Sequence, residues 1–221
     1  MKTLIDISYY QEPNKIDYDK LSKQIDGVIL RAAYGTGVDG RWANQPDPAF
    51  DEHYQEFKRC GIPVGAYHYI VEYKSVDAQI AIMKQALDGK ELSHIKVWDG
   101  EKYIKQLAFF ADVELERNAP DLTRKTVIEY ITKAEEYFGE KIAIYTGAWC
   151  WNPIMGMDNP YSDRLLWVGS YTPSPYMPYG WNEWWIWQYT SSGRLDGYYS
   201  SLDMNRVPDN KWSVWEDDTS P

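Results

Sequence analysis

The sequence predicts an α/β fold, a closed barrel in which strands alternate with helices. About eight short runs rich in β-branched and aromatic residues recur along the chain, and apolar stripes of helical period separate the earlier runs. Such alternation is typical of a parallel sheet. The helical signal weakens after residue 147, where Pro, Gly and Trp increase, so the last third of the barrel is expected to lack its helices. A doubly wound open sheet is the alternative.

The expected elements follow one another in a regular order. The strands cover residues 3–8, 27–33, 63–70, 107–113, 141–146, 165–169, 184–190 and, more weakly, 199–204. Three apolar stripes predict helices between them, formed by Phe50, Tyr54 and Phe57, by Val76, Ile80, Met83 and Leu87, and by Val127, Ile131, Ala134 and Phe138. Ser75 and Thr123 are expected N-caps, and Gly139 is expected to end the third helix. The barrel is assigned to residues 1–207, and residues 208–221 to a C-terminal tail or the start of a linker.

Composition and charge exclude several classes of protein. The 33 acidic and 23 basic residues give a net charge of −10, which would repel the phosphates of a nucleic acid. No run approaches the roughly 20 apolar residues that span a bilayer, so we expect no membrane anchor and no signal peptide. The chain carries 11 Trp, 19 Tyr and 5 Phe, more than a core requires. Flat amphipathic rings are suited to binding the faces of sugars.

The sequence lacks the parts of a metal, nucleotide or serine-hydrolase site. His53, His68 and His94 stand far apart on different segments, without the spacing of zinc ligands. Neither a Gly-x-Ser-x-Gly motif nor a Gly-rich phosphate loop is present. We therefore expect no metal and no cofactor, and carboxylates remain as the candidate catalytic groups.

Two Asp-x-Glu motifs occur, and their surroundings differ. Asp99 and Glu101 flank a Gly in a polar stretch, whereas Asp112 and Glu114 follow the apolar run 107–111. Chance alone predicts about one such motif in a chain of this composition, so context decides between them. Residues i and i+2 of a strand face the same side, which would bring the second pair together on a buried face. Two neighbouring carboxyl groups with different pKa values, one protonated and one ionised, are what a glycosidase uses for catalysis. The alternative interpretation is that Asp112 and Glu114 simply project into solvent at the end of a strand.

Two further acids occupy strand positions. Asp6 interrupts the first expected strand, and Asp203 lies in the last. Near the C-terminal ends of the first, fourth and eighth strands, the acids would converge on one mouth of the barrel, because the first and last strands are neighbours once it closes. Each Asp taken alone is equally compatible with a turn-forming or capping role.

Seven motifs in order resemble those of the glycoside hydrolase family 25 lysozymes, the muramidases of phage endolysins, bacterial autolysins and some fungi. They are DISYYQ at residues 6–11, GAYHY at 65–69, FADVE at 110–114, IYT at 144–146, LWVGSY at 166–171, WQY at 187–189 and LDMN at 202–205. The resemblance covers residues 3–207. It implies an irregular, TIM-like (β/α)5(β)3 barrel that hydrolyses the β-1,4 bond between N-acetylmuramic acid and N-acetylglucosamine in the glycan strands of peptidoglycan.

The resemblance also implies roles for the four acids. Glu114 becomes the proton donor, Asp112 its partner carboxylate, and Asp6 and Asp203 the acids beside them. One departure is the segment 88–106, which looks longer than this family usually has before its Asp-x-Glu strand. We expect this insertion to form a lid or an additional subsite wall.

Aromatic residues near strand ends are the candidate substrate contacts. Tyr67, Tyr145 and Tyr171 fall at or near expected strand ends, and Gln188 is interpreted either as a hydrogen-bonding partner or as a polar strand residue. The tryptophans close to Gln188 are expected mainly in the core, and they are Trp184, Trp185 and Trp187.

Three further expectations concern the mechanism, the alternatives and the setting. Because Asp112 and Glu114 lie side by side on one strand, retention with assistance from the 2-acetamido group of the substrate is predicted over inversion. A non-catalytic glycan-binding barrel and an N-acetylglucosaminidase or chitinase are the alternative functions. We expect a monomer made in the cytoplasm of a phage-infected host that acts on the cell wall after release.

Overall fold

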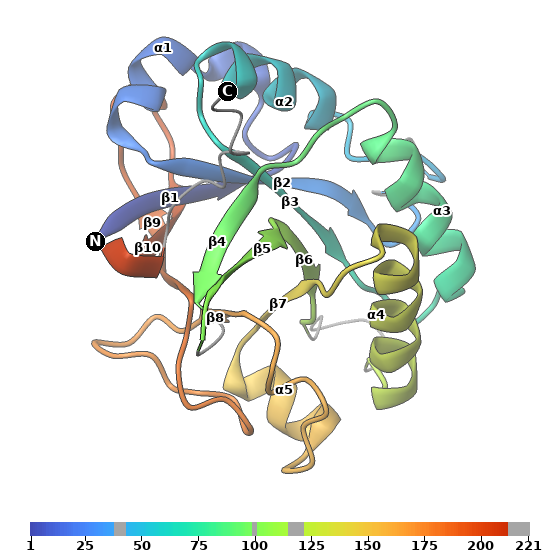
Figure 1. Cartoon of the computed structure of the whole chain (residues 1–221). Coiled ribbons are helices and arrows are strands. Elements are labelled where there is room, and N and C mark those ends of the chain that lie inside the picture. Colours follow the sequence, from blue (N-terminus) through green and yellow to red (C-terminus); the bar gives the residue numbers. More distant parts are fainter. Residues whose placement is uncertain (38–42, 99–100, 115–121, 212–221) are drawn as a thin grey trace, which may run out of the picture.

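Eight strands form a closed barrel in the computed structural model, which describes residues 1–37, 43–98, 101–114 and 122–211 (Figure 1). Around the barrel the order is β1-β10-β9-β8-β7-β6-β3-β2, so the expected closed barrel is confirmed and the open sheet is excluded. The barrel strands are β1 (Lys2–Ile7), β2 (Gly27–Tyr34), β3 (Val64–Tyr69), β6 (Phe109–Asp112), β7 (Ala143–Thr146), β8 (Leu166–Gly169), β9 (Ile186–Gly193) and β10 (Leu202–Val207).

The barrel is parallel except at its last strand. β10 runs antiparallel to both of its neighbours, β9 and β1, whereas the other neighbouring pairs are parallel. The parallel sheet that the alternation of strands and helices indicates is thus confirmed for seven strands and corrected for β10. The physical reason is the short connection 194–201, because a parallel crossover needs a dozen residues or more.

Helices surround the first five barrel strands, and in the described part of the chain no α-helix follows any of the last three (Figure 1). They are α1 (Tyr18–Leu21), α2 (Phe50–Arg59), α3 (Val76–Leu87), α4 (Arg124–Phe138) and α5 (Ala148–Met155), joined by the 3-10 turns η1 (Pro13–Lys15), η2 (Ser22–Gln24) and η3 (Asp209–Lys211). Each of the five helices follows one of the first five barrel strands, which confirms the (β/α)5(β)3 arrangement. Both expected N-caps accept a backbone N–H, and Gly139 ends α4 with a φ of 70°.

The helix α5 was not expected from the sequence. Its segment contains Pro153 and two tryptophans, which lower the intrinsic preference for a helix. Trp151 is nevertheless completely buried, and its ring lies 4.8 Å from that of Trp181. Burial of this large apolar side chain outweighs the unfavourable local sequence.

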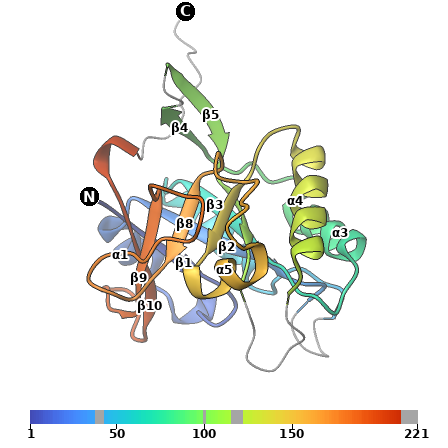
Figure 2. The same cartoon turned by 90° about the horizontal axis from the view of Figure 1, so that it is seen from below.

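A two-stranded hairpin, β4 (His94–Trp98) and β5 (Tyr103–Leu107), lies outside the barrel. Ile95 and Val97 are buried against barrel residues such as Phe110. Because the hairpin directly precedes β6, it lies at the end where the parallel strands begin (Figure 2). The expectation that 88–106 forms a lid or wall of the site is therefore wrong, since the site lies at the other end.

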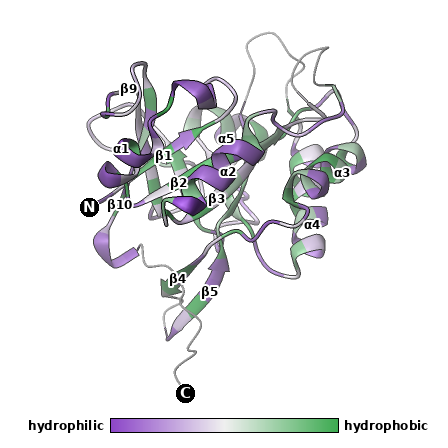
Figure 3. Ribbon diagram, turned by 90° about the horizontal axis from the view of Figure 1, so that it is seen from above, coloured by the Kyte–Doolittle hydropathy of each residue, from purple (hydrophilic) through white to green (hydrophobic). Residues whose placement is uncertain are grey.

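Apolar side chains fill both the barrel and the layer between the barrel and its helices. The cluster inside the barrel includes Leu4, Ile29, Phe110 and Trp167. The outer cluster packs between the barrel and the helices. The helices turn polar faces outward, as α2 does in Figure 3. Near β9, Trp185 and Trp187 are buried as expected, and Trp184 is half-buried. In the described part of the chain, no helix has both the length and the apolar character needed to cross a membrane.

Candidate active site

Four carboxyl groups meet in one cavity of about 220 Å³ at the C-terminal ends of the parallel strands. Asp6 on β1 lies directly opposite Asp203 on β10 in the strand register. Asp112 is the last residue of β6, and Glu114 follows two residues later. Asp203 was expected near the C-terminal end of its strand, and the structure places it at the start of β10. Because β10 is antiparallel to its neighbours, Asp203 still lies at the same mouth of the barrel as the other acids.

The expected substrate contacts line the same cavity. Tyr67 comes from β3, Tyr145 from β7, Gln188 from β9, and Tyr171 from the segment just after β8. All eight residues singled out from the sequence are thus brought together, although they are spread over nearly the whole chain. Their chemical roles remain predictions.

Asp6 is held by two amide side chains. The Nε2 of Gln188 donates to both carboxylate oxygens at 3.0 and 3.2 Å, and the Nδ2 of Asn205 donates to Oδ2 at 2.8 Å. These donors stabilise the ionised form of Asp6. Burial acts in the opposite direction and is the largest effect, so the pKa of Asp6 rises to about 6.

Three donors determine which way the two amides point. The Oε1 of Gln188 accepts from the hydroxyls of Tyr145 at 2.7 Å and Tyr171 at 2.9 Å. The Oδ1 of Asn205 accepts from Trp167 Nε1 at 2.7 Å. Because both amide oxygens are occupied, both NH₂ groups must face Asp6. Gln188 is therefore a hydrogen-bonding partner of the site, and Asn205 and Trp167 are partners that sequence reasoning missed.

The other three acids have raised pKa values. Burial, followed by repulsion from Asp6, raises the pKa of Glu114 to about 7 and that of Asp203 to about 8. For Asp112 burial, repulsion from Glu114 and repulsion from Asp6 raise the pKa well above its usual range. As the pH rises, Asp6, whose ionised form the amides favour, is therefore expected to lose its proton before Glu114, which keeps a proton that it can donate.

A buried ion pair lies beside the acids and was also missed. Arg31 Nε on β2 donates to Asp47 Oδ2 at 2.7 Å, and both side chains are almost fully buried. The positive charge of Arg31 partly counteracts the rise in the pKa of Asp112. A charged residue in the apolar run GVILRAAY was the available signal, because an isolated charge in a buried strand needs a partner.

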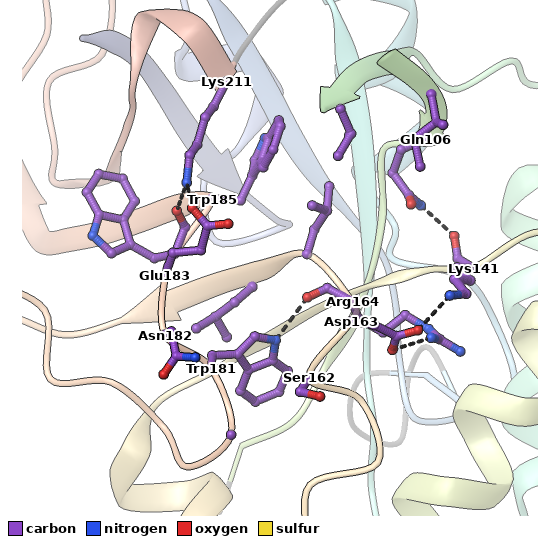
Figure 4. Close-up of a pocket in the computed structure, with 16 residues that line it drawn as sticks. Gln106, Lys141, Ser162, Asp163, Arg164, Trp181, Asn182, Glu183, Trp185 and Lys211 are labelled. Carbon is purple, nitrogen blue, oxygen red and sulfur yellow. Dashed lines mark hydrogen bonds and ion pairs between the residues drawn. The ribbon is translucent and has the colours of Figure 1, made fainter. Parts of the chain in front are cut away.

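A larger cavity of about 590 Å³ lies at the opposite end of the barrel, between the β4–β5 hairpin and the segment before β9 (Figure 4). Its acids are paired with cations: Asp163 with Lys141 at 2.6 Å, and Glu183 with Lys211 at 2.5 Å. The cations around Asp163 lower its pKa, against burial, so this carboxylate is unsuited to donating a proton.

Glu101, from the other Asp-x-Glu motif, lies near this opposite end as well. Glu101 is exposed next to the turn of the hairpin, and Asp99 lies outside the described residues. The three histidines are also separated, and burial holds the pKa of His68 near 3. Among the described residues, no group of three or more His, Cys, Asp or Glu is arranged to hold a metal ion.

Comparison with known proteins places these features in a family. The family model of Glycosyl hydrolases family 25 matches residues 5–198. The uncharacterized protein YegX of Escherichia coli O157:H7 is 29% identical over 206 residues, which is 91% of this chain and about two thirds (67%) of that protein.

Two solved structures have the same fold. GHIP, a glycosyl hydrolase 25 of Streptococcus pneumoniae, superposes with a TM-score of 0.73 at 26% identity, over 95% of this chain and 88% of that one. The bacterial lysozyme of Streptomyces coelicolor has a TM-score of 0.74 at 21% identity, over 93% and 91% of the two chains. The family match covers most of the barrel. It includes Asp6, Asp112 and Glu114, and it ends before Asp203. The chain is a glycoside hydrolase and belongs to glycosyl hydrolases family 25.

Proposed function

We propose that this protein is a muramidase, which hydrolyses the β-1,4 bond between N-acetylmuramic acid and N-acetylglucosamine in peptidoglycan. The observation that carries the proposal is the division of protonation in one cavity: Glu114 has a pKa of about 7, and amide donors favour an ionised Asp6. One acid that donates a proton beside one that is charged is the arrangement a glycosidase needs. The lysozyme from Streptomyces coelicolor, which shares the fold, supports the choice of substrate.

In the proposed reaction Glu114 protonates the glycosidic oxygen as the bond to the leaving sugar breaks. The carboxylate of Asp6 stabilises the positive charge that develops at the anomeric carbon. The carbonyl oxygen of the substrate's own 2-acetamido group attacks that carbon and forms a cyclic intermediate. Glu114, now ionised, takes a proton from the water that opens this intermediate, and the product keeps the β configuration.

Asp112 is the group proposed to orient the acetamido group. Within the described part of the chain, its buried Oδ1 has no hydrogen-bond partner. A buried acceptor without a partner is costly, and the acetamido N–H of a bound sugar would satisfy it. This unpaired oxygen supports substrate assistance over inversion, in which Asp6 or Asp203 would act as a base on water.

The stereochemical prediction is retention. NMR of a digest taken before mutarotation should show the β-anomer of the newly formed reducing end first. An initial α-anomer would contradict substrate assistance and assign the reaction to the inverting alternative.

The bond that is cleaved is tested by the identity of the new reducing end. Digestion of purified peptidoglycan followed by borohydride reduction should convert N-acetylmuramic acid ends to N-acetylmuramitol, which mass spectrometry of the released muropeptides identifies. Reduced N-acetylglucosamine ends would instead indicate a glucosaminidase. Binding of glycan without any release of reducing ends would indicate a non-catalytic barrel.

A further inference from the structure

A further cavity, of about 620 Å³, adjoins the acid cavity, and four of the nine residues that line it are aromatic: Tyr145, Trp149, Tyr171 and Tyr176. Three residues, Glu114, Tyr145 and Tyr171, line both cavities, which are therefore continuous. The remaining lining residues come from the start of α5, the end of β8 and the segment after β8, and they are Ala148, Trp149, Gly169, Ser170, Thr172 and Tyr176. Nothing in the reaction described above uses the aromatic part.

Trp149 is exposed and lies close to the backbone of the neighbouring strand ends. Its side chain lies over the backbone of Gly147, where a Cβ atom would come within 2.3 Å of Trp149 Nε1 and 2.9 Å of the carbonyl oxygen of Gly169. Only glycine leaves room for the indole to lie so close to the strand ends. At the same time 55% of Trp149 is accessible, which leaves an apolar surface beside the proton donor.

Tyr176 provides a second exposed ring on the segment after β8, with 68% of the residue accessible. Hydrogen bonds fix the segment that carries it. The Oγ of Ser170 accepts the backbone N–H of Tyr176 at 3.0 Å and is bonded to the hydroxyl of Thr172 at 2.8 Å. The two exposed rings, Trp149 and Tyr176, offer apolar faces on which a flat ligand such as a sugar ring can stack.

The charge of the aromatic cavity narrows the choice of ligand. Among the described residues that line it, Glu114 is the only acid and no Lys, Arg or His is present. The cavity is therefore suited to an uncharged ring with an apolar face, which fits N-acetylglucosamine better than a sugar bearing a free carboxylate.

The position of Glu114 assigns the two cavities to the two sides of the scissile bond. The proton donor must reach the glycosidic oxygen, so that oxygen lies where the cavities meet. The sugar that develops positive charge belongs beside Asp6 and Asp112, in the acid cavity. We propose that the aromatic cavity binds the leaving N-acetylglucosamine, with Trp149 as the stacking surface; this inference rests on the muramidase function proposed above.

Two substrates that differ only in the leaving group test the proposal. One is the trisaccharide GlcNAc–MurNAc–GlcNAc, and the other is the methyl β-glycoside of GlcNAc–MurNAc, whose methyl group is too small to reach the aromatic cavity. In Trp149→Ala we expect kcat/KM for the trisaccharide to fall about tenfold, the size of one aromatic contact, and that for the methyl glycoside to stay unchanged. Trp149→Phe should restore most of the loss.

Tyr103→Ala is the matched control, because Tyr103 is similarly exposed, at 53%, on the hairpin at the opposite end of the barrel. It should change neither rate. An equal loss on both substrates in Trp149→Ala, or no loss on either, would overturn the aromatic subsite while leaving the muramidase function intact. Release of neither leaving group by the unmodified protein would overturn the muramidase function, and the subsite with it.

Discussion

Replacement of Glu114 by Gln is expected to reduce the rate of wall lysis by about 10²-fold to 10⁴-fold, the usual effect of removing a general acid. Glutamine keeps the shape of the side chain and cannot donate the proton that the leaving oxygen needs. The initial rate at which a suspension of purified cell walls loses turbidity measures the effect.

The same substitution should not weaken the fold at neutral pH. The pKa of Glu114 is raised from 4.5 to about 7, so the folded state binds this proton more tightly than the unfolded state does. The stabilisation by this proton is therefore present below pH 4.5 and is lost as the pH rises through 7. Thermal unfolding of Glu114→Gln should accordingly depend less on pH across this window than that of the unmodified protein.

Glu101→Gln is the matched control, because Glu101 belongs to the other Asp-x-Glu motif and is exposed near the opposite end of the barrel. It should leave lysis unchanged, as should Asp99→Asn. An inactive Glu101 variant beside an active Glu114 variant would show that the wrong motif has been chosen.

Replacement of Asp6 by Asn is expected to lower kcat/KM about 10²-fold or more, because it removes the carboxylate that stabilises the developing positive charge. It should also change the pH dependence. In the unmodified protein, kcat/KM should fall below about pH 6 as Asp6 is protonated and above about pH 7 as Glu114 loses its proton. In Asp6→Asn the acidic limb should disappear and the alkaline limb should remain.

Asp26→Asn is the matched control. Asp26 also contacts β1, but at the end opposite to Asp6, where it accepts hydrogen bonds from Lys2 and from the backbone N–H of Thr3. Both limbs should persist in this variant. Because the four acids titrate together, the limbs belong to the group of carboxyls as a whole. If the acidic limb survives in Asp6→Asn, the limb reports the titration of another carboxyl group of the cavity. That result would contradict the role given to Asp6.

Much of the site could be predicted because its signals are local. The end of an apolar run pointed to Asp112 and Glu114, and a charge inside the first expected strand pointed to Asp6. Alternation along a strand put Asp112 and Glu114 on one face. Closure of the barrel then implied that Asp203 lies beside Asp6, which the strand register confirms.

Other features depend on packing that no short segment encodes. The helix α5 exists in spite of Pro153 because Trp151 is buried in the core. The segment 88–106 was expected to form a lid or a subsite wall because it looked longer than the resemblance implies. Length alone does not show which end of the barrel an insertion covers, and the burial of Ile95 and Val97 in the structure does. The direction of a strand and the end of the barrel that a segment covers are set by the connecting segments and by contacts between residues far apart in the sequence.

The sequence by itself determined the alternation of strands and helices, the order of the motifs, and the identity of the carboxyl groups, since each follows from the chemistry of neighbouring residues. Only the tertiary structure decided which of these carboxyls carries charge. That depends on Gln188 and Asn205, which lie some 180 to 200 residues from Asp6 along the chain and reach it within 3.2 Å. Burial and hydrogen bonding, the two effects that divide the protons among the acids, arise when the barrel closes.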